Sequence, residues 1–142
     1  MTWFNGKRIL VPFDFSDASI DAVRMALELA ESPDEVHLLH VLLELPATDP
    51  AVVWDALDET KRIDHTREAM QNRLSDEGIS GPKLDVGVGS PGQVAADLAT
   101  EIEAGLIVIP SHGYTGIKRW FLGSVAETVV RLAKCPVLVL KG

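Results

Sequence analysis

The sequence has one cysteine, no long apolar run and a deficit of positive charge. Because Cys135 is the only cysteine in 142 residues, an intrachain disulfide and a zinc or redox framework of paired cysteines are both excluded. No apolar run approaches the roughly 18 residues that a membrane-spanning helix needs, and the N-terminal segment lacks the apolar core and cleavage site of a signal peptide. These absences predict a cytoplasmic protein.

Acidic residues outnumber basic ones. Lys and Arg total 13 against 21 Asp and Glu, so the formal net charge is −8 with neutral histidines. Nucleic acids and anionic membranes are recognised through basic surfaces, so this balance argues against both as partners. Hydrophobic residues make up 46% of the chain, which is enough to bury a core, and we expect residues 1–142 to form one domain.

Short apolar runs alternate with longer amphipathic segments, a pattern that is typical of parallel α/β proteins. The first run is continuous rather than alternating, as expected of a strand that is covered on both faces. The predicted strands are residues 8–13, 35–43, 83–88, 106–109 and 137–140. The predicted helices are one that Ser16 or Asp17 can cap and that runs to Ala30, and residues 51–77, 91–104 and 124–133.

These elements imply a single doubly wound domain with a five-stranded parallel sheet in the order 3-2-1-4-5 and helices on both faces. In that order ligands bind outside the carboxyl ends of the first and fourth strands. Pro12 and Pro110 stand at those two ends, and proline belongs where strand pairing stops because it has no N–H to donate. The two prolines indicate a cleft, although simple strand termination explains them nearly as well.

One glycine motif resembles a dinucleotide fingerprint. Residues 87–92 read Gly-Val-Gly-Ser-Pro-Gly, which matches GxGxxG between a strand and a helix. The fingerprint belongs after the first strand and needs an acidic residue at the end of the following one, where this chain has Ile109-Pro-Ser-His. We therefore interpret the motif as a tight turn into a helix.

The segment from Pro110 to Gly123 is rich in glycine and leads into a predicted helix at Ser124. Glycines let a ligand approach the backbone, and the free N–H groups and dipole at a helix N-terminus favour an anion. The segment is therefore suited to phosphate. The alternative is that Ser124 and Glu127 form an S-x-x-E capping box, which satisfies the helix end without a ligand.

Four segments, taken in order, resemble the universal stress protein family. They are VPFDFS at residues 11–16, LHV at 39–41, IVIPSHG at 107–113 followed by nine residues and Gly123-Ser124, and KCPVLVL at 134–140. The resemblance runs from about Lys7 to the C-terminus. It implies a five-stranded α/β fold, dimerisation and, in one group of members, ATP binding.

The ATP-binding signature of that family is a glycine, two residues, a second glycine, nine residues, a third glycine and then Ser or Thr. This chain matches it at Gly113, Gly123 and Ser124, but Pro110 stands in place of the first glycine. Proline lacks the N–H donor, and losing one charge-assisted hydrogen bond weakens a site by about 10- to 150-fold. ATP or another adenine nucleotide remains the expected ligand.

The resemblance assigns the base and ribose end of the pocket to two groups of residues. Asp14 and Val41 would surround the adenine, and Pro12 and Phe13 would line the pocket around it. Ile109 and Pro110 would lie near the ribose. The Asp14 carboxylate can accept hydrogen bonds from adenine or ribose. Its alternative role is that of an acid in a strand-to-helix turn.

The phosphate end is assigned to the glycine-rich segment. Gly113, Gly123, Ser124 and Val125 would offer backbone or hydroxyl groups to the phosphates, and His112 could donate from the same segment. No metal-ligand cluster stands out in the sequence, because His37 and His40 are predicted to face opposite sides of a strand. Any Mg²⁺ or Mn²⁺ would be carried by the nucleotide itself.

Enzymatic interpretations are weak. The sequence has no GxxxxGK[ST], HExxH or Gly-x-Ser-x-Gly motif, so we expect no dedicated catalysis and at most slow, incidental ATP hydrolysis. The favoured function is a stress-response or regulatory protein that binds an adenine nucleotide. The alternatives are a protein-interaction module of the same fold without a nucleotide and, by fold analogy alone, a flavin or other mononucleotide binder.

The last strand indicates a homodimer. Val137, Leu138, Val139 and Leu140 are all apolar, and in the order 3-2-1-4-5 they lie on an edge of the sheet. An open apolar edge invites pairing, and only Lys141 supplies charge nearby. We expect this strand to pair with its copy across a twofold axis, the alternative being a monomer in which the preceding helix covers the edge.

Overall fold

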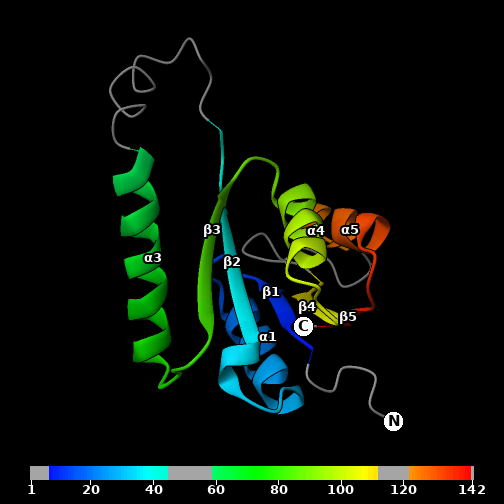
Figure 1. Cartoon of the computed structure of the whole chain (residues 1–142), viewed down its shortest axis with the longest axis horizontal. Helices are drawn as coiled ribbons and strands as arrows, with labels where there is room; N and C mark the ends of the chain where they lie inside the picture. The colour runs from blue at the N-terminus through cyan, green and yellow to red at the C-terminus, as the bar shows by residue number, and fades with distance from the viewer. Residues whose placement is uncertain (1–6, 45–58, 112–121, 142) are drawn as a thin grey trace.

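A computed structural model describes residues 7–44, 59–111 and 122–141 and shows strands alternating with helices along the chain (Figure 1). The strands are β1 (Ile9–Pro12), β2 (Val36–Leu42), β3 (Lys83–Val88), β4 (Leu106–Pro110) and β5 (Val137–Leu140). The helices are α1 (Asp17–Leu29), the short 3₁₀ helix η1 (Pro33–Glu35), α3 (Glu59–Asp76), α4 (Pro91–Glu101) and α5 (Ser124–Leu132). The expected start of the long helix, at residue 51, lies outside the described residues.

The five strands form one parallel sheet in the order β3-β2-β1-β4-β5, which confirms the predicted fold. Helices cover both faces (Figure 1). Alternate residues of β1 divide between them: Ile9 and Val11 belong to the core cluster beside α1 and α3, whereas Leu10 packs with residues of α4 and α5. Strand β1 is therefore buried on both of its faces, which explains why its sequence is continuously apolar.

Helix α4 ends earlier than the sequence indicates, at Glu101 instead of Ala104. Glu103 adopts a left-handed conformation with φ of 56°. The Ala104 N–H donates to the Ala99 carbonyl at 2.8 Å and the Glu103 N–H to the Thr100 carbonyl at 3.1 Å, which is the hydrogen-bond pattern of a Schellman motif. A glycine usually occupies this position, so its absence hid the end of the helix.

The sheet opens between β1 and β4. These strands pair only at Ile9 with Leu106 and at Leu10 with Ile107, whereas β1 stays paired with β2 and β4 with β5 up to Pro12 and Pro110. The carboxyl halves of the two central strands are therefore held by their outer neighbours and separate from each other. This is the opening that the two prolines indicated.

The glycines of residues 87–92 are explained by packing. A Cβ at Gly87 would lie 2.7 Å from Val94 Cγ1, and one at Gly92 would lie 2.5 Å from Thr128 Cβ on α5. Gly89 has a φ of 135° and donates its N–H to the Leu42 carbonyl at 2.9 Å. The motif thus forms a tight turn into α4 and lets α4 approach α5.

We predict that Gly92→Ala destabilises the protein, because the added Cβ forces α4 and α5 apart. Overpacking of this kind costs about 1–3 kcal/mol. Gln93→Ala is the control, since Gln93 is exposed and its amide bonds only Asp97 one turn away. Urea unfolding should show a lower free energy of unfolding for Gly92→Ala, whereas that of the control should change by no more than about 0.5 kcal/mol. Equal stability of the two variants would contradict the packing role.

Candidate functional site

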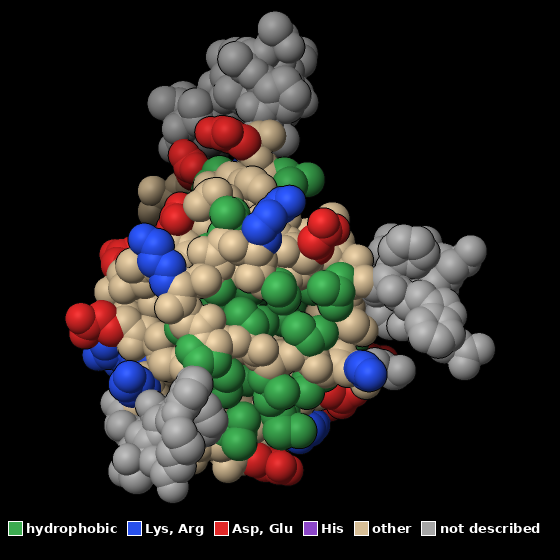
Figure 2. All heavy atoms as spheres, turned by 90° about the vertical axis from the view of Figure 1, so that its right-hand side faces the viewer, with side chains coloured by type: hydrophobic (Ala, Val, Ile, Leu, Met, Phe, Trp, Pro, Cys, Tyr) green, Lys and Arg blue, Asp and Glu red, His purple; other side chains and the backbone are tan. Residues whose placement is uncertain are grey.

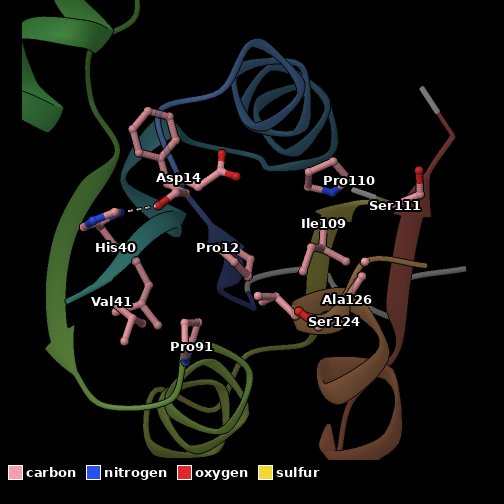
Figure 3. A pocket seen from close by; sticks show the side chains of 14 residues that line it. Pro12, Asp14, His40, Val41, Pro91, Ile109, Pro110, Ser111, Ser124 and Ala126 are labelled. Carbon is pink, nitrogen blue, oxygen red and sulfur yellow. Dashed lines mark hydrogen bonds between the residues drawn. The ribbon is translucent and has the colours of Figure 1, made fainter. Parts of the chain in front are cut away.

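A cavity of about 260 Å³ occupies the opening between β1 and β4 (Figure 3). Its walls come from the carboxyl ends of three strands and from the first turns of α4 and α5. The lining residues are Pro12, Phe13, Asp14, Leu39, His40, Val41, Pro91, Ile109, Pro110, Ser111, Gly123, Ser124, Val125 and Ala126. The cavity therefore lies where a doubly wound sheet places its ligands.

Most of the residues predicted for a nucleotide site line this cavity. Nine of them do so: Pro12, Phe13, Asp14, Val41, Ile109, Pro110, Gly123, Ser124 and Val125. The other two, His112 and Gly113, lie outside the described residues. The structure thus brings the nine residues together, and the role of each toward a ligand remains a prediction.

Asp14 is held in a tight turn between β1 and α1. The backbone N–H of Ser16 donates to Asp14 Oδ1 at 3.0 Å, and the Ser16 hydroxyl donates to the same oxygen. Ser16 also caps α1, since its Oγ accepts from the Ser19 N–H at 3.1 Å. Figure 3 shows the Asp14 carboxylate directed toward the side of the cavity where Pro110 lies. Both hydrogen bonds from Ser16 go to Oδ1, and Oδ2 is the second acceptor of the carboxylate.

The N-terminus of α5 forms the opposite wall. Gly123 is the N-cap residue, with φ of −62° and ψ of 160°, and no side chain accepts from the first turn of the helix. The alternative considered for this segment, a capping box of Ser124 and Glu127, does not form, because Ser124 lies one position inside the helix. The first N–H groups of α5 are left without a side-chain cap and carry the positive end of the helix dipole beside the cavity.

The middle of the cavity is apolar. Pro12, Val41, Pro91 and Ile109 present hydrocarbon between the Asp14 carboxylate and the start of α5 (Figure 3). No lysine or arginine is among the lining residues that the structure describes. Such a cavity can enclose a flat, mostly apolar ring, accept a hydrogen bond at one end and offer N–H donors at the other.

Five lining residues were not predicted from the sequence: Leu39, His40, Pro91, Ser111 and Ala126. Leu39 could have been found from strand register, because it pairs with Pro12. His40 Nδ1 donates to the Phe13 carbonyl at 2.8 Å, so this histidine fixes the backbone at the end of β1 beside the cavity (Figure 3). A contact across 27 residues of sequence leaves no local signal.

The two strand histidines have separate partners. His37 Nδ1 lies 3.2 Å from Asp85 Oδ2 on β3, whereas His40 contacts the turn after β1. Within the described ranges, no three His, Cys, Asp or Glu side chains gather as metal ligands. The helices described in these ranges also include none that is long and apolar enough to cross a membrane.

The sequence matches the universal stress protein family over residues 6–141. A universal stress protein of Methanocaldococcus jannaschii, MJ0531, is 33% identical over 143 residues, covering 95% of this chain and 82% of that protein. Universal stress protein E of Escherichia coli is 36% identical over 84% of this chain, which spans only 39% of that longer protein. The chain belongs to the universal stress protein family.

Solved structures agree with this assignment. The structure of MJ0577, another universal stress protein of M. jannaschii, superposes with a TM-score of 0.76 and is 30% identical, with 96% of each chain covered. A universal stress protein in complex with cAMP superposes with a TM-score of 0.62 and is 25% identical, covering 94% of this chain and 96% of that one. The fold and family of this chain are thereby established.

Proposed function

We propose that the protein binds ATP or another adenine nucleotide in the cavity between β1 and β4 and acts as a stress-response or regulatory protein. The observation that carries this proposal is the pairing of a carboxylate and an uncapped helix N-terminus across an apolar cavity. Adenine carries hydrogen-bond donors for Asp14, and phosphates suit the N–H groups of α5. The universal stress protein that was solved in complex with cAMP is similar to this chain in fold and sequence, and cAMP is itself an adenine nucleotide.

Pro110 affects how the nucleotide would be held. The Ser111 N–H donates to Leu140 on the β5 side at 2.8 Å, and successive N–H groups of a strand alternate in direction. The nitrogen of residue 110 therefore faces the opening toward β1. A glycine there would supply an N–H to the cavity, whereas proline supplies only a ring. Any Mg²⁺ or Mn²⁺ would arrive with the phosphates.

The chemistry of the described residues favours binding over catalysis. Universal stress proteins are generally regulatory proteins, and the cavity joins an apolar middle to a carboxylate and a helix N-terminus, an arrangement suited to holding a ligand. Burial raises the pKa of the Cys135 thiol, which therefore is not an activated thiolate, and Cys135 does not line the cavity. We propose at most slow, incidental hydrolysis.

We predict that the purified protein binds ATP, ADP or AMP in calorimetry and that Gly123→Val weakens binding by at least about tenfold. Valine fits the backbone of Gly123, whose φ is −62°, but its branched side chain occupies the space in front of the α5 N-terminus. The control is Leu122→Val, a change at an exposed neighbour that does not line the cavity. Absence of binding by the parent protein at millimolar nucleotide would refute the proposed function.

We also predict that Pro110→Gly tightens ATP binding. The new N–H would face the cavity, and one hydrogen bond to a charged group contributes about 1.5–3 kcal/mol, or roughly 10- to 150-fold in affinity. The flexibility of glycine offsets part of this gain. Calorimetry of the two proteins under one buffer condition measures the ratio. Unchanged or weaker binding would mean that residue 110 acts through its shape.

The proposed assembly is a homodimer through the outer edge of β5. Figure 2 shows apolar side chains gathered on the face of the molecule that α5 and β5 occupy. Val130 is 46% exposed and Leu132 is 38% exposed on α5, and Val137 to Leu140 of β5 are only half-buried. Pairing with a second copy would cover these groups and satisfy the free edge of β5.

We predict a mass near twice the chain's 15.4 kDa in sedimentation equilibrium at micromolar concentration. Val139→Pro or Val139→Lys should dissociate the dimer. The carbonyls of Pro136 and Leu140 accept from the N–H groups of Ile107 and Ser111, so they face β4. Because the backbone groups of a strand alternate in direction, the Val139 N–H points away from β4 and toward the edge.

Leu29→Lys is the matched control for this interface, because Leu29 is an exposed leucine on α1 and lies on a different element. Circular dichroism checks that each variant is folded. A folded Val139→Pro protein that remains dimeric would move the interface elsewhere, and a parent protein near 15.4 kDa would refute the dimer.

A further inference from the structure

The turn that carries Asp14 contains a residue in an unfavourable conformation. Phe15 has a φ of 67°, in the left-handed region that bulky residues rarely adopt. The hydrogen bond from the Ser16 N–H to Asp14 Oδ1 closes across Phe15, so this backbone conformation determines where the Asp14 carboxylate points. Strain of this kind persists only where surrounding groups hold it, and it gathers at ligand sites.

Two aromatic contacts hold the Phe15 ring. Its centroid lies 5.0 Å from that of Phe13 and 5.0 Å from that of His40, the second pair being edge-to-face. His40 also donates to the Phe13 carbonyl, and the Phe13 N–H donates to the Leu39 carbonyl at 2.8 Å. The side chains of the turn are thus anchored to β2.

The backbone of the turn is held by one side chain of α3. Arg73 Nη1 donates to the Phe15 carbonyl at 2.8 Å, and Nη2 donates to Asp17 Oδ1 at 2.7 Å and to Glu77 Oε1 at 3.2 Å. The Arg73 side chain is only 25% exposed. Its hydrogen bond to Asp17, with that to Glu77, raises the pKa of Arg73 above its usual value, so the guanidinium stays charged.

We infer that Arg73 is a positioning residue of the nucleotide site. By holding the Phe15 carbonyl from α3, it keeps the strained turn closed and the Asp14 carboxylate directed into the cavity, without itself touching the ligand. Arg73 does not line the cavity. This inference rests on the proposed function and names a residue through which the packing of α3 controls nucleotide affinity.

A purely structural role for Arg73, joining α1 to α3, predicts a different result. Arg24 on α1 makes the same kind of connection, because its Nη2 donates to the Glu77 carbonyl at 3.2 Å and to Glu77 Oε2 at 3.1 Å. Arg24 makes no described contact with the turn. Arg24→Met therefore removes an arginine between α1 and α3 and serves as the matched control for Arg73→Met, which keeps an apolar stem of similar length.

The test is calorimetry with ATP on the full chain. Arg73→Met should weaken ATP binding by about tenfold, because without Arg73 the binding free energy must also force Phe15 into its unfavourable backbone conformation. Arg24→Met should leave ATP binding unchanged. In the Asp14→Asn background, Arg73→Met should add less than about twofold, because it acts through the carboxylate that is no longer there. Full additivity of the two changes would overturn the inference.

Hydrogen exchange of the ligand-free protein gives a second readout. The peptide covering residues 13–19 should exchange faster in Arg73→Met than in the parent or in Arg24→Met, while urea unfolding shows both variants folded. Parent-like exchange in this peptide, or parent-like ATP affinity, would overturn the inference and leave the proposed function standing. A parent protein that binds no adenine nucleotide would overturn both.

Discussion

The site depends on the opening of the sheet between β1 and β4. The two strands pair at only two positions and then separate, each held by its outer neighbour, with a proline closing each strand. Backbone groups that would have paired within a continuous sheet instead border a cavity, which Asp14 lines on one side and the start of α5 on the other. Without that separation, both features would lie on a closed sheet edge with no space between them.

The two walls of the cavity are built by different means. The α5 wall is a helix N-terminus set close to α4 by Gly92, which has no Cβ to meet Thr128, so its geometry follows from backbone packing. The Asp14 wall is a turn containing the left-handed Phe15, held by aromatic rings and by hydrogen bonds from distant residues. The first wall therefore depends on the close approach of two helices, whereas the second depends on side chains from β2 and α3.

Local sequence signals predicted much of the fold. Strands β3 and β5 match the expected bounds because turn residues border both apolar runs. The C-terminus of α4 was misplaced because Glu103 occupies a position that usually carries glycine. The alternative capping box at α5 does not form because Gly123, with no side-chain oxygen, is the cap. The cavity residues at the ends of β1 and β4, namely Pro12, Ile109 and Pro110, were predicted, but the contacts of His40 and Arg73 with the turn were not. Those contacts join residues 27 and 58 positions apart, and no periodicity or motif encodes them.

The charge distribution of the cavity would orient a nucleotide within it. The chain has a formal net charge of −8, and the described lining offers phosphates the N–H dipoles at the α5 N-terminus. Asp14 stands at the other wall. Two unit charges about 10 Å apart at an effective dielectric constant of about 20 repel by on the order of 1–2 kcal/mol. A reversed nucleotide would bring phosphate still closer to that carboxylate and lose the α5 N–H groups, whereas the forward one places the donors of adenine beside it. The carboxylate would therefore contribute to orientation as well as to affinity, which is why its position in the turn matters to the proposed site.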